Sequence, residues 1–464
     1  MSMRRIHLTA LLLAVACETP ATTTAPVATS IAMSATEVSF TSLGDTIRLT
    51  AAVRDENGNH IDEATITWSS SDESIATVST TGSVQSVRGG TAIITASAGE
   101  VSAATSVSVS VWESLSAGYW HTCGLTSEGD AYCWGMNSDS QLGDGTTELR
   151  SRASLVDGGY KWISIAGAGR HTCGVTSEGD AYCWGFNGYG QLGDGTTTDH
   201  REPTLVTGGH NWVSVSGGYE RTCGLTSVGK AYCWGRNRGG QLGDGTTTNS
   251  STPSEVSGNH TWVSIGANGR HACGLTSESE IYCWGDNYYG QLGNGSRGSS
   301  PVPTLVSGNL PWTSVTPGGW HTCGRTEAND AYCWGRNLHT DYGGQLGDGT
   351  TTNRTTPVFV TGWFSWASLG AGSHHTCGVT MTAKAYCWGH YPSPDFSLGD
   401  GVSTASSLPI PVGGNLLWMA FTGAEEHTCG LATTGEAYCW GPGLSGQLGN
   451  GSTVSSSVPV KVIR

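Results

Sequence analysis

A pair of cysteines separated by ten residues occurs seven times and restricts the possible folds more than any other feature of this chain. In the first copy, two β-prone runs flank a Gly-containing turn in His121-Thr-Cys-Gly-Leu-Thr-Ser-Glu-Gly-Asp-Ala-Tyr-Cys-Trp-Gly135, which predicts a β-hairpin. If the turn centres on Glu128, Cys123 lies directly opposite Cys133. Opposed residues of antiparallel strands are about 4.5 to 5.5 Å apart, close to the Cα separation of a disulfide.

The repeated spacing predicts seven local disulfides and an oxidising, extracytoplasmic compartment. The pairs are Cys123 with Cys133, Cys173 with Cys183, Cys223 with Cys233, Cys273 with Cys283, Cys323 with Cys333, Cys377 with Cys387 and Cys429 with Cys439. Zinc is the competing interpretation. It favours spacings of about two to four residues and four converging ligands, which the repeat does not supply, so we expect no metal and no other cofactor.

Composition favours strands over helices. Charged residues make up only 13% of the 464 residues, whereas glycine is enriched to 69 residues, as suits many short strands and tight turns. The net charge of −15 would repel phosphate backbones, so we expect no nucleic-acid partner.

The N-terminus has the form of an export signal, predicted over residues 1–16. Arg4 and Arg5 precede an apolar run, Leu8 to Ala16, that is too short to span a membrane permanently. Ala14-Val15-Ala16 fits a signal-peptidase site, whereas Leu-Ala-Val-Ala-Cys17 resembles a bacterial lipoprotein box, although Ala14 stands where leucine is usual.

We expect Cys17 to carry the lipid, because it is the one cysteine without a partner and the Thr/Ala/Pro-rich residues 17–29 resemble a tether. A free thiol is the alternative. The predicted location is the cell envelope or surface, or the medium if the protein is secreted, with membrane contact only through the lipid.

Residues 30–111 predict a small β-sandwich. Period-2 alternation and β-branched runs occur at Ile47 to Val53, Thr65 to Trp68, Ile75 to Val78, Thr91 to Ala96 and Val101 to Val111. The segment resembles the bacterial immunoglobulin-like group 2 domain through Leu43-Gly-Asp-Thr, Asp55-Glu-Asn-Gly58, Thr67-Trp-Ser-Ser-Ser-Asp72, Ala76-Thr-Val78, Gly82 and Gly90-Thr-Ala-Ile-Ile-Thr95. The resemblance implies an extracellular spacer or adhesive module, with Trp68 as its core aromatic.

Residues 112–464 predict a seven-bladed β-propeller. Tryptophan recurs with a period of 50 residues, later interrupted by small insertions, at Trp112, Trp162, Trp212, Trp262, Trp312, Trp366 and Trp418. Each repeat contains four predicted strands, such as Trp112 to Ser116, His121 to Thr126, Ala131 to Gly135 and, in the next repeat, Pro203 to Val206. The expected fold is therefore all-β, a propeller preceded by a sandwich.

The repeat resembles the regulator of chromosome condensation family of propellers through His171-Thr-Cys-Gly-Val-Thr and Tyr182-Cys-Trp-Gly-Phe-Asn-Gly-Tyr-Gly-Gln-Leu-Gly-Asp-Gly195. The resemblance covers residues 112–464 and implies the propeller fold. The family includes exchange factors for small GTPases and a secreted β-lactamase inhibitor protein, which binds its target with the loop face. The export signal, paired cysteines and acidic charge depart from the nuclear member, so we do not expect nucleotide exchange.

The C-terminal strand is predicted to close the ring of blades. Ser457-Val-Pro-Val-Lys-Val-Ile463 matches the Pro-containing strand of earlier repeats, yet no such strand directly precedes Trp112. We expect it to lie beside the Trp112 strand, where it would close the ring and shield exposed edges.

Features shared by the repeats are expected to be structural. Six repeats hold a histidine (121, 171, 271, 321, 375 and 427), which predicts a repeated hydrogen bond more readily than a metal ring; Arg221 replaces the seventh. The Gly-Asp-Gly motif predicts a turn rather than a calcium loop, because Asn294 and Asn450 replace the acid in two copies. The Trp134 position predicts core packing.

Residues that the repeat does not require identify a candidate binding face. In a meander of strands A to D, the A–B and C–D loops lie on one face. Its aromatic and arginine residues have the composition of interface hot spots, and the predicted contacts are Tyr119, Trp120, Phe186, Tyr189, Arg236, Arg238, Tyr288, Tyr289, Trp320, Arg336 and Tyr391. The same face holds Arg170, Tyr219, Glu220, Arg270, Asp286, Glu425 and Glu426.

The sequence therefore predicts an exported, lipid-anchored, monomeric protein that binds a protein or glycan through this face and is not an enzyme. One alternative is an envelope scaffold without a discrete ligand. Another is a propeller lyase or hydrolase, although no paired acid, nucleophile motif or metal cluster is distinct from the repeat.

Overall fold

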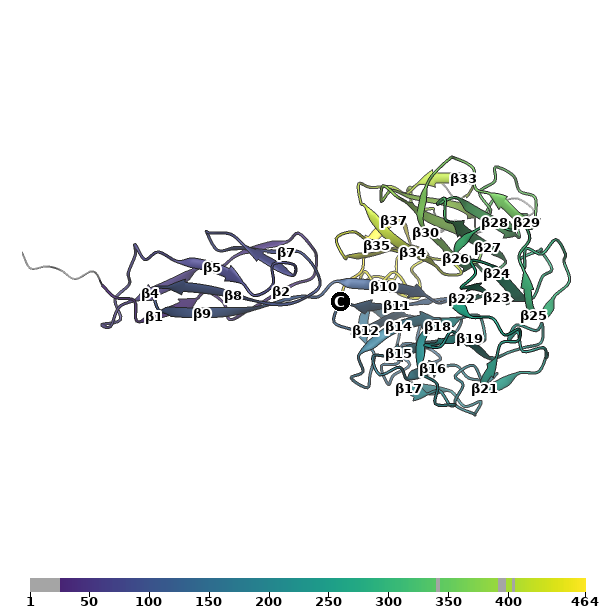
Figure 1. Ribbon diagram of the computed structural model, residues 1–464, viewed down its shortest axis with the longest axis horizontal. Helices are drawn as coiled ribbons and strands as arrows, with labels where there is room; N and C mark the ends of the chain where they lie inside the picture. Colours follow the sequence, from purple (N-terminus) through teal and green to yellow (C-terminus); the bar gives the residue numbers. More distant parts are fainter. Residues whose placement is uncertain (1–25, 339–342, 391–397, 403–404) are drawn as a thin grey trace, which may run out of the picture.

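The computed structural model describes residues 26–338, 343–390, 398–402 and 405–464, and everything regular in these ranges is β-strand. The expected all-β fold is confirmed: an immunoglobulin-like domain precedes seven separate four-stranded sheets (Figure 1). No helix occurs in these ranges, and hence no helical membrane span. The predicted signal peptide and Cys17 lie outside the described residues.

The N-terminal domain is a sandwich of three small sheets. Its strands are β1 (Ser30–Met33), β2 (Glu37–Phe40), β3 (Thr46–Arg48), β4 (Ala51–Arg54), β5 (Thr67–Ser70), β6 (Ala76–Val78), β7 (Ser83–Ser86), β8 (Gly90–Ala98) and β9 (Val101–Val109). The sheets have the orders β1-β4, β2-β9-β8-β5 and β3-β7-β6. Trp68 is only partly buried and packs against a core that includes Phe40, Ile94 and Val107.

Each blade of the propeller is one contiguous segment of chain, with strands A to D in sequence order. Blades 1 to 4 comprise β10 (Trp112–Ala117), β11 (His121–Thr126), β12 (Ala131–Gly135) and β13 (Arg150–Leu155); β14 (Trp162–Gly167), β15 (His171–Thr176), β16 (Ala181–Gly185) and β17 (His200–Leu205); β18 (Trp212–Gly217), β19 (Arg221–Thr226), β20 (Ala231–Gly235) and β21 (Ser250–Glu255); and β22 (Trp262–Asn268), β23 (His271–Thr276), β24 (Ile281–Gly285) and β25 (Ser300–Leu305).

Blades 5 to 7 repeat this plan. They comprise β26 (Trp312–Pro317), β27 (His321–Thr326), β28 (Ala331–Gly335) and β29 (Arg354–Phe359); β30 (Trp366–Ala371), β31 (His375–Thr380), β32 (Ala385–His390) and β33 (Ala405–Pro411); and β34 (Trp418–Gly423), β35 (Thr428–Ala432), β36 (Ala437–Gly441) and β37 (Ser456–Lys461). The A strands of all seven blades line a central channel with a volume of about 270 Å³.

The cysteines pair within blades, whereas the core that surrounds them lies between blades. Cys123 is the register partner of Cys133, and all seven pairs are disulfide-bonded with Cα separations of 4.0 to 4.1 Å. The blade 1 disulfide packs against Trp162 and Trp184 of blade 2. A blade alone would expose this apolar face, so each blade depends on its neighbour.

The expected closure of the ring by the C-terminal strand is wrong. β37 pairs with β36 of its own blade, and β10 pairs only with β11 among the described strands. Blades 7 and 1 instead meet through the same core as other neighbours, because Trp112 and Trp134 pack against the Cys429–Cys439 disulfide. The seam needs no exchanged strand, since this core already buries the apolar face of each blade.

The repeated histidine makes the repeated hydrogen bond that the sequence predicts. His Nε2 lies 2.7 to 2.9 Å from the threonine Oγ1 of the next blade at six seams. At five of them, that threonine hydroxyl also donates to a glutamine carbonyl, such as Thr172 to Gln141 at 2.7 Å. The histidine Nε2–H is therefore the donor to the threonine there.

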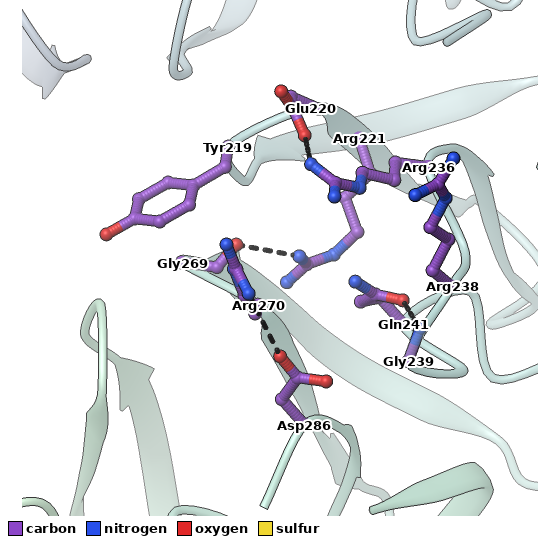
Figure 2. Close-up of a pocket in the computed structure, with 10 residues that line it drawn as sticks. All are labelled: Tyr219, Glu220, Arg221, Arg236, Arg238, Gly239, Gln241, Gly269, Arg270 and Asp286. Atoms are coloured by element: carbon purple, nitrogen blue, oxygen red, sulfur yellow. Dashed lines mark hydrogen bonds and ion pairs between the residues drawn. The ribbon is translucent and has the colours of Figure 1, made fainter. Parts of the chain in front are cut away.

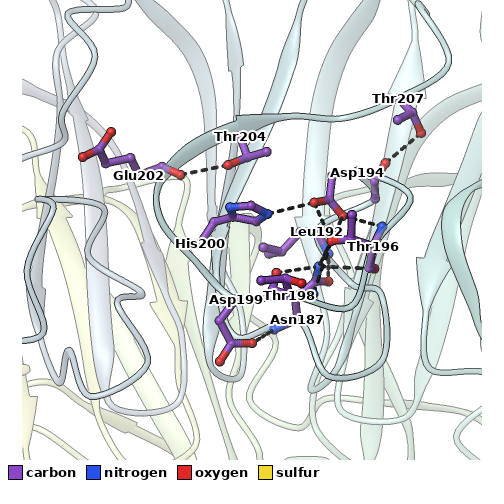
Figure 3. Close-up of polar contacts among 11 residues, drawn as sticks. Asn187, Leu192, Asp194, Thr196, Thr198, Asp199, His200, Glu202, Thr204 and Thr207 are labelled. Atoms are coloured by element: carbon purple, nitrogen blue, oxygen red, sulfur yellow. Dashed lines mark hydrogen bonds and ion pairs between the residues drawn. The ribbon is translucent and has the colours of Figure 1, made fainter.

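The Gly-Asp-Gly motif forms a turn closed by its own side chains (Figure 3). In blade 2, Asp194 Oδ1 accepts hydrogen bonds from the Thr196 amide at 2.9 Å and from Asn187 Nδ2 at 3.2 Å. Asp194 Oδ2 lies 2.9 Å from His200 Nε2. Protein donors therefore use the carboxylate that a calcium ion would need, which agrees with the interpretation of the motif as an Asx turn.

The N-terminal domain contacts blades 1 and 7 at their B–C turns. The Leu43 amide donates to the Thr434 carbonyl at 2.9 Å, and Ser42 Oγ donates to Glu436 Oε1 at 2.8 Å. On blade 1, the Ser127 amide donates to the Val111 carbonyl at 2.9 Å. The C-terminus lies beside the linker that enters β10 (Figure 1).

Candidate functional site

The A–B and C–D loops form one face of the propeller, opposite the turns that contact the N-terminal domain. The loops of one blade are joined by backbone bonds, such as Met136 N to Trp120 O at 2.8 Å and Phe186 N to Arg170 O at 3.0 Å. B–C turns instead bond to the following D–A loop, as Trp162 N does to Gly129 O at 2.8 Å. We refer to the first face as the A–B/C–D face.

A continuous row of aromatic side chains crosses this face. The row runs through Trp120, Tyr119, Tyr219, Trp320, Tyr289 and Tyr288, with successive ring centroids 4.4 to 6.4 Å apart. The residues come from blades 1, 3, 4 and 5, so the loops bring together rings that are distant in sequence. Tyr288 is 73% exposed, whereas the other five rings are half-buried.

Arginines lie over the aromatic rings of this face. Arg270 lies 5.6 Å above the ring of Trp320, and Arg336 lies 5.1 Å above that of Tyr289. Such cation–π contacts attract the guanidinium group to the ring face, and a guanidinium group in this position can still donate hydrogen bonds, as Arg336 Nε does to the Leu338 carbonyl at 3.3 Å.

A second cluster centres on blade 2. Phe186 and Tyr189 are 6.2 Å apart, with Arg170 above the first ring at 4.8 Å and Arg236 above the second at 5.1 Å. Arg170 also forms a two-pronged ion pair with Asp139, at 2.6 and 2.8 Å, which uses its outer edge.

Three residues at the channel mouth, Tyr119, Tyr219 and Glu425, are half-buried. Burial raises the pKa of Tyr119, and the charges of Tyr219 and Glu425 raise it further. Burial, and then the neighbouring charge of Glu426, raises the pKa of Glu425 to about 7. Tyr219 reaches across the mouth toward blade 6, with its hydroxyl 3.4 Å from Ser373 Oγ. Tyr119 and Tyr219 therefore narrow the entrance to the channel.

The seam between blades 3 and 4 differs from the other six. Arg221 replaces the histidine of blade 3, and its partner position in blade 4 holds Ala272 instead of threonine. The guanidinium donates to the backbone carbonyls of Gly269 at 2.9 Å, Asn268 at 3.1 Å and His271. Burial lowers the pKa of Arg221 to about 10, which still leaves it charged at neutral pH. This seam alone therefore places a charge at the histidine position.

Arg221 forms part of the lining of a pocket of about 150 Å³ on the A–B/C–D face (Figure 2). Four arginines and two carboxylates line it, namely Arg221, Arg236, Arg238, Arg270, Glu220 and Asp286. Arg236 is paired with Glu220, whereas Arg270 comes only within 4.0 Å of Asp286. Burial raises the pKa of Asp286, although the three neighbouring arginines Arg270, Arg221 and Arg236 oppose this effect.

Ten of the eleven predicted contact residues can be placed on this face. Eight belong to the aromatic row and its arginines or to the pocket, and the other two, Phe186 and Tyr189, form the blade 2 cluster with Arg236. Tyr391 lies outside the described residues. Arg238 is exposed and makes no hydrogen bond or ion pair with any residue that the structure describes.

Sequence reasoning placed Tyr219, Arg270 and Asp286 on the face without singling them out. Tyr219 joins the two halves of the aromatic row, and Arg270 connects that row with the pocket. The sequence held one signal for the pocket. Position 221 is arginine where the other repeats have histidine, and position 272 is alanine where the other repeats have threonine. Within the described ranges, no three His, Cys, Asp or Glu side chains are placed to share a metal ion.

Comparison with protein families gives matches over both parts of the chain. Two models of the regulator of chromosome condensation (RCC1) repeat match, one at residues 128–175, 178–225, 228–275, 278–324 and 434–464, the other at 112–141, 162–191, 212–241, 262–291 and 312–342. The model of the bacterial Ig-like domain (group 2) matches residues 27–109.

Solved propellers are similar in fold. Prp20p of Saccharomyces cerevisiae has a TM-score of 0.64 and 23% identity, over 72% of this chain and 86% of its own. Human WBSCR16 has a TM-score of 0.65 and 20% identity, over 72% and 94%. The ultraviolet-B receptor UVR8 of Arabidopsis thaliana is 28% identical over 121 residues, which span 26% of this chain and 28% of the receptor.

Proposed function

Because this chain belongs to the regulator of chromosome condensation repeat family and joins such a propeller to a bacterial Ig-like domain, we propose that it is a protein-binding module of the bacterial cell exterior. The binding surface in this proposal is the A–B/C–D face. Among propellers of this fold, Prp20p has been described for its binding to Gsp1p and histones.

The observation that carries the proposal is the continuous row of six aromatic rings. The repeat does not require these rings, since other blades hold glycine, serine or glutamate at the position of Tyr119 and arginine, glutamate or histidine at the position of Trp120. Aromatic and arginine side chains that cluster in a shielded surface are the residues that supply most of the energy at protein interfaces.

The proposed location depends on the cysteines. Seven disulfides form and persist outside the reducing cytosol, and the Ig-like domain is of a bacterial type. The N-terminal domain contacts the face opposite the aromatic row, so it could connect to the cell without covering the binding surface. Lipid attachment at Cys17 remains a prediction from the sequence.

The test is capture of partners from envelope and secreted fractions by immobilised protein, with the variant Trp120→Ala/Trp320→Ala beside the wild type. We expect a band that the wild type retains and the double variant loses. Trp363→Ala is the matched control, because Trp363 is 91% exposed but lies in a D–A loop on the opposite face.

Undiminished capture by the double variant would rule out this face as the binding surface. Loss of capture by Trp363→Ala as well would indicate adhesion to exposed tryptophan in general. Treatment of the fractions with protease or with glycosidase distinguishes a protein partner from a glycan, which the sequence also allows. Identical thermal unfolding curves for the three proteins show that the variants are folded.

A further inference from the structure

The geometry of the blade 3–4 seam points to a carboxylate-binding pocket, which would receive an aspartate, glutamate or C-terminal carboxylate of the partner protein. The pocket is the cavity lined by Arg221, Arg236, Arg238 and Arg270 (Figure 2). This inference rests on the proposed function, because it names the chemical group that the partner presents to the A–B/C–D face.

The first argument is the charge of the pocket. The four arginines exceed the two carboxylates by two positive charges, on a protein whose net charge is −15. At the other seams, the histidine at the position of Arg221 is uncharged near neutral pH, because burial lowers its pKa; that of His171, for example, falls to about 3. Positive charge is thus gathered at one seam of an otherwise acidic protein.

The second argument is the number of donors without partners. Arg238 and Arg270 donate no hydrogen bond to any residue that the structure describes, and Arg270 Nη1 is 4.0 Å from Asp286 Oδ2. Arg221 is 2% exposed, and its Nε is without a partner in the same ranges. A buried guanidinium group normally finds acceptors, so the unpaired Nε of Arg221 indicates a missing acceptor. Arg238 and Arg270 are exposed around the same cavity, and their donors are available to an external acceptor.

Arg170 is an arginine of the same face that is paired with a carboxylate of its own chain. It occupies the position in blade 2 that Arg270 occupies in blade 4, and both lie over an aromatic ring. Arg170 makes a two-pronged ion pair with Asp139 of its own chain, at 2.6 and 2.8 Å. An external carboxylate supplies for Arg270 the contact that Asp139 supplies for Arg170.

Size and charge favour a single carboxylate over a more highly charged anion. A cavity of about 150 Å³ fits a carboxyl group on a short aliphatic stem. Glu220 and Asp286 already lie in its wall and would repel a second negative charge, and the overall charge of −15 repels polyanions at longer range. The planar fork of arginine matches the two oxygens of a carboxylate.

The test uses the full-length protein and two small probes, glutarate and inorganic phosphate, titrated at low ionic strength by ligand-observed NMR. We expect glutarate to bind more tightly than phosphate, with an affinity that falls as salt is added. Arg238→Gln and Arg270→Gln should each weaken glutarate binding by about fivefold or more, because each removes a charged donor. Arg170→Gln is the matched control and should leave it within about twofold.

The buried cation is tested by the double variant R221H/A272T, which installs the histidine–threonine pair that six seams already have. This variant keeps the link between the blades while it removes the charge, so we expect normal folding and about tenfold weaker glutarate binding. Equal glutarate affinity in the wild type and in all pocket variants would overturn the inference, and so would an equal loss in Arg170→Gln.

Tighter binding of phosphate than of glutarate would overturn the carboxylate assignment in favour of a phosphorylated or sulfated ligand. The experiment distinguishes failure of the proposed function from failure of this inference, because Trp120 lies outside the pocket lining. Trp120→Ala should reduce capture of the partner and leave glutarate binding unchanged. Glutarate binding without any capture would retain the pocket but contradict the binding face.

Discussion

Ala383 occupies a backbone conformation that four other blades give to glycine. It lies in the B–C turn of blade 6 with φ of 61°, where blades 1, 2 and 3 hold Gly129, Gly179 and Gly229 at φ of 75° to 88°. A Cβ in this left-handed region costs about 1 to 2 kcal/mol, which the greater freedom of unfolded glycine partly offsets.

We therefore expect Ala383→Gly to raise the free energy of unfolding by about 0.5 to 1 kcal/mol in denaturant titrations with the disulfides intact. Gly129→Ala is the reverse substitution at the equivalent turn and should lower it. A loss of stability in Ala383→Gly would mean that the side chain makes a compensating contact.

Glu425 makes stability depend on pH in an unusual direction for a carboxyl group. Its pKa in the folded protein, about 7, is above the ordinary value of 4.5. The folded state therefore binds a proton that the unfolded state has released between pH 4.5 and 7, and stability falls as the pH rises through this window.

Glu425→Gln should remove this loss. Relative to the wild type, the variant should gain up to about 3 kcal/mol of unfolding free energy between pH 4.5 and 7.5, as measured by urea titration at each pH. A constant difference between the two proteins across the range would show that Glu425 titrates normally.

Single residues were the hardest part of the candidate site to predict. The sequence shows that Arg221 and Ala272 are exceptions in their repeats, but only the structure shows that these two positions face each other across a seam, as His171 and Thr222 do at the preceding one. Arg270 is likewise only weakly paired with a carboxylate, because its Nη1 lies 4.0 Å from Asp286 Oδ2. No pattern along the chain predicts this distance.

The strand pairs were predictable wherever pairing is local. Each B–C hairpin closes over four residues, so the register of Cys123 with Cys133 follows from symmetry about the turn. In the N-terminal domain, the predicted strand Ile47 to Val53 instead divides into β3 and β4, which belong to different sheets. Alternation reveals which side chains are buried, but it does not reveal which sheet a short strand joins.

The histidine–threonine links between the blades predict sensitivity to mild acid. Burial lowers the pKa of His121, His171, His321 and His427 to about 3, and that of His375 to about 4. The unfolded chain takes up these protons at about pH 6.5, so stability is present above that pH and is lost as the pH falls toward the folded values.

We expect the free energy of unfolding to fall steeply between pH 6.5 and 4, by up to about 1.4 kcal/mol per pH unit for each histidine that contributes. His171→Gln should reduce the slope by about one sixth, if the six links contribute equally. A profile that stays flat down to pH 4 would mean that the histidines are protonated in the folded protein.

For the whole molecule, the periodicity was sufficient to predict the number of blades but not how the ring closes. The fifty-residue repeat specifies one blade, and seven copies specify the ring. The last strand would join the first blade only if the sequence repeat and the blade began at different strands. Here both begin at the A strand, and β10 to β13 already complete blade 1. The core around Trp112 and Trp134, together with the hydrogen bond between His427 and Thr122, then closes the ring without an exchanged strand.

The oxidation state and the proposed anchor can be read from one measurement. Intact-mass analysis of protein purified from its native envelope without reductant should show a mass 14 Da below that of the reduced chain, since each of seven disulfides removes two hydrogens. An added mass of acyl chains on a chain that begins at Cys17 would establish the lipid anchor. Free thiols in the repeats would contradict the proposed location outside the cytoplasm.

The contacts of the N-terminal domain should stabilise the propeller. Burial alone would raise the pKa of Glu436, but hydrogen bonds from Lys461, Ser42 and Tyr438 lower it to about 2, so the carboxylate is charged at neutral pH. Ser42→Ala removes one of these bonds and should lower the free energy of unfolding by about 1 kcal/mol at pH 7. Ser39→Ala, at an exposed bond within the domain, is the control and should have a smaller effect.

These contacts have a mechanical consequence. The chain runs covalently from blade to blade across six seams, and the seam between blades 7 and 1 is the one that it does not cross. The N-terminal domain holds Thr434 and Glu436 on one side of that seam and Ser127 on the other. With the anchor and the binding face that we propose, tension between the N-terminus and a bound partner would be shared between the first and last blades, at the place where the ring would otherwise open.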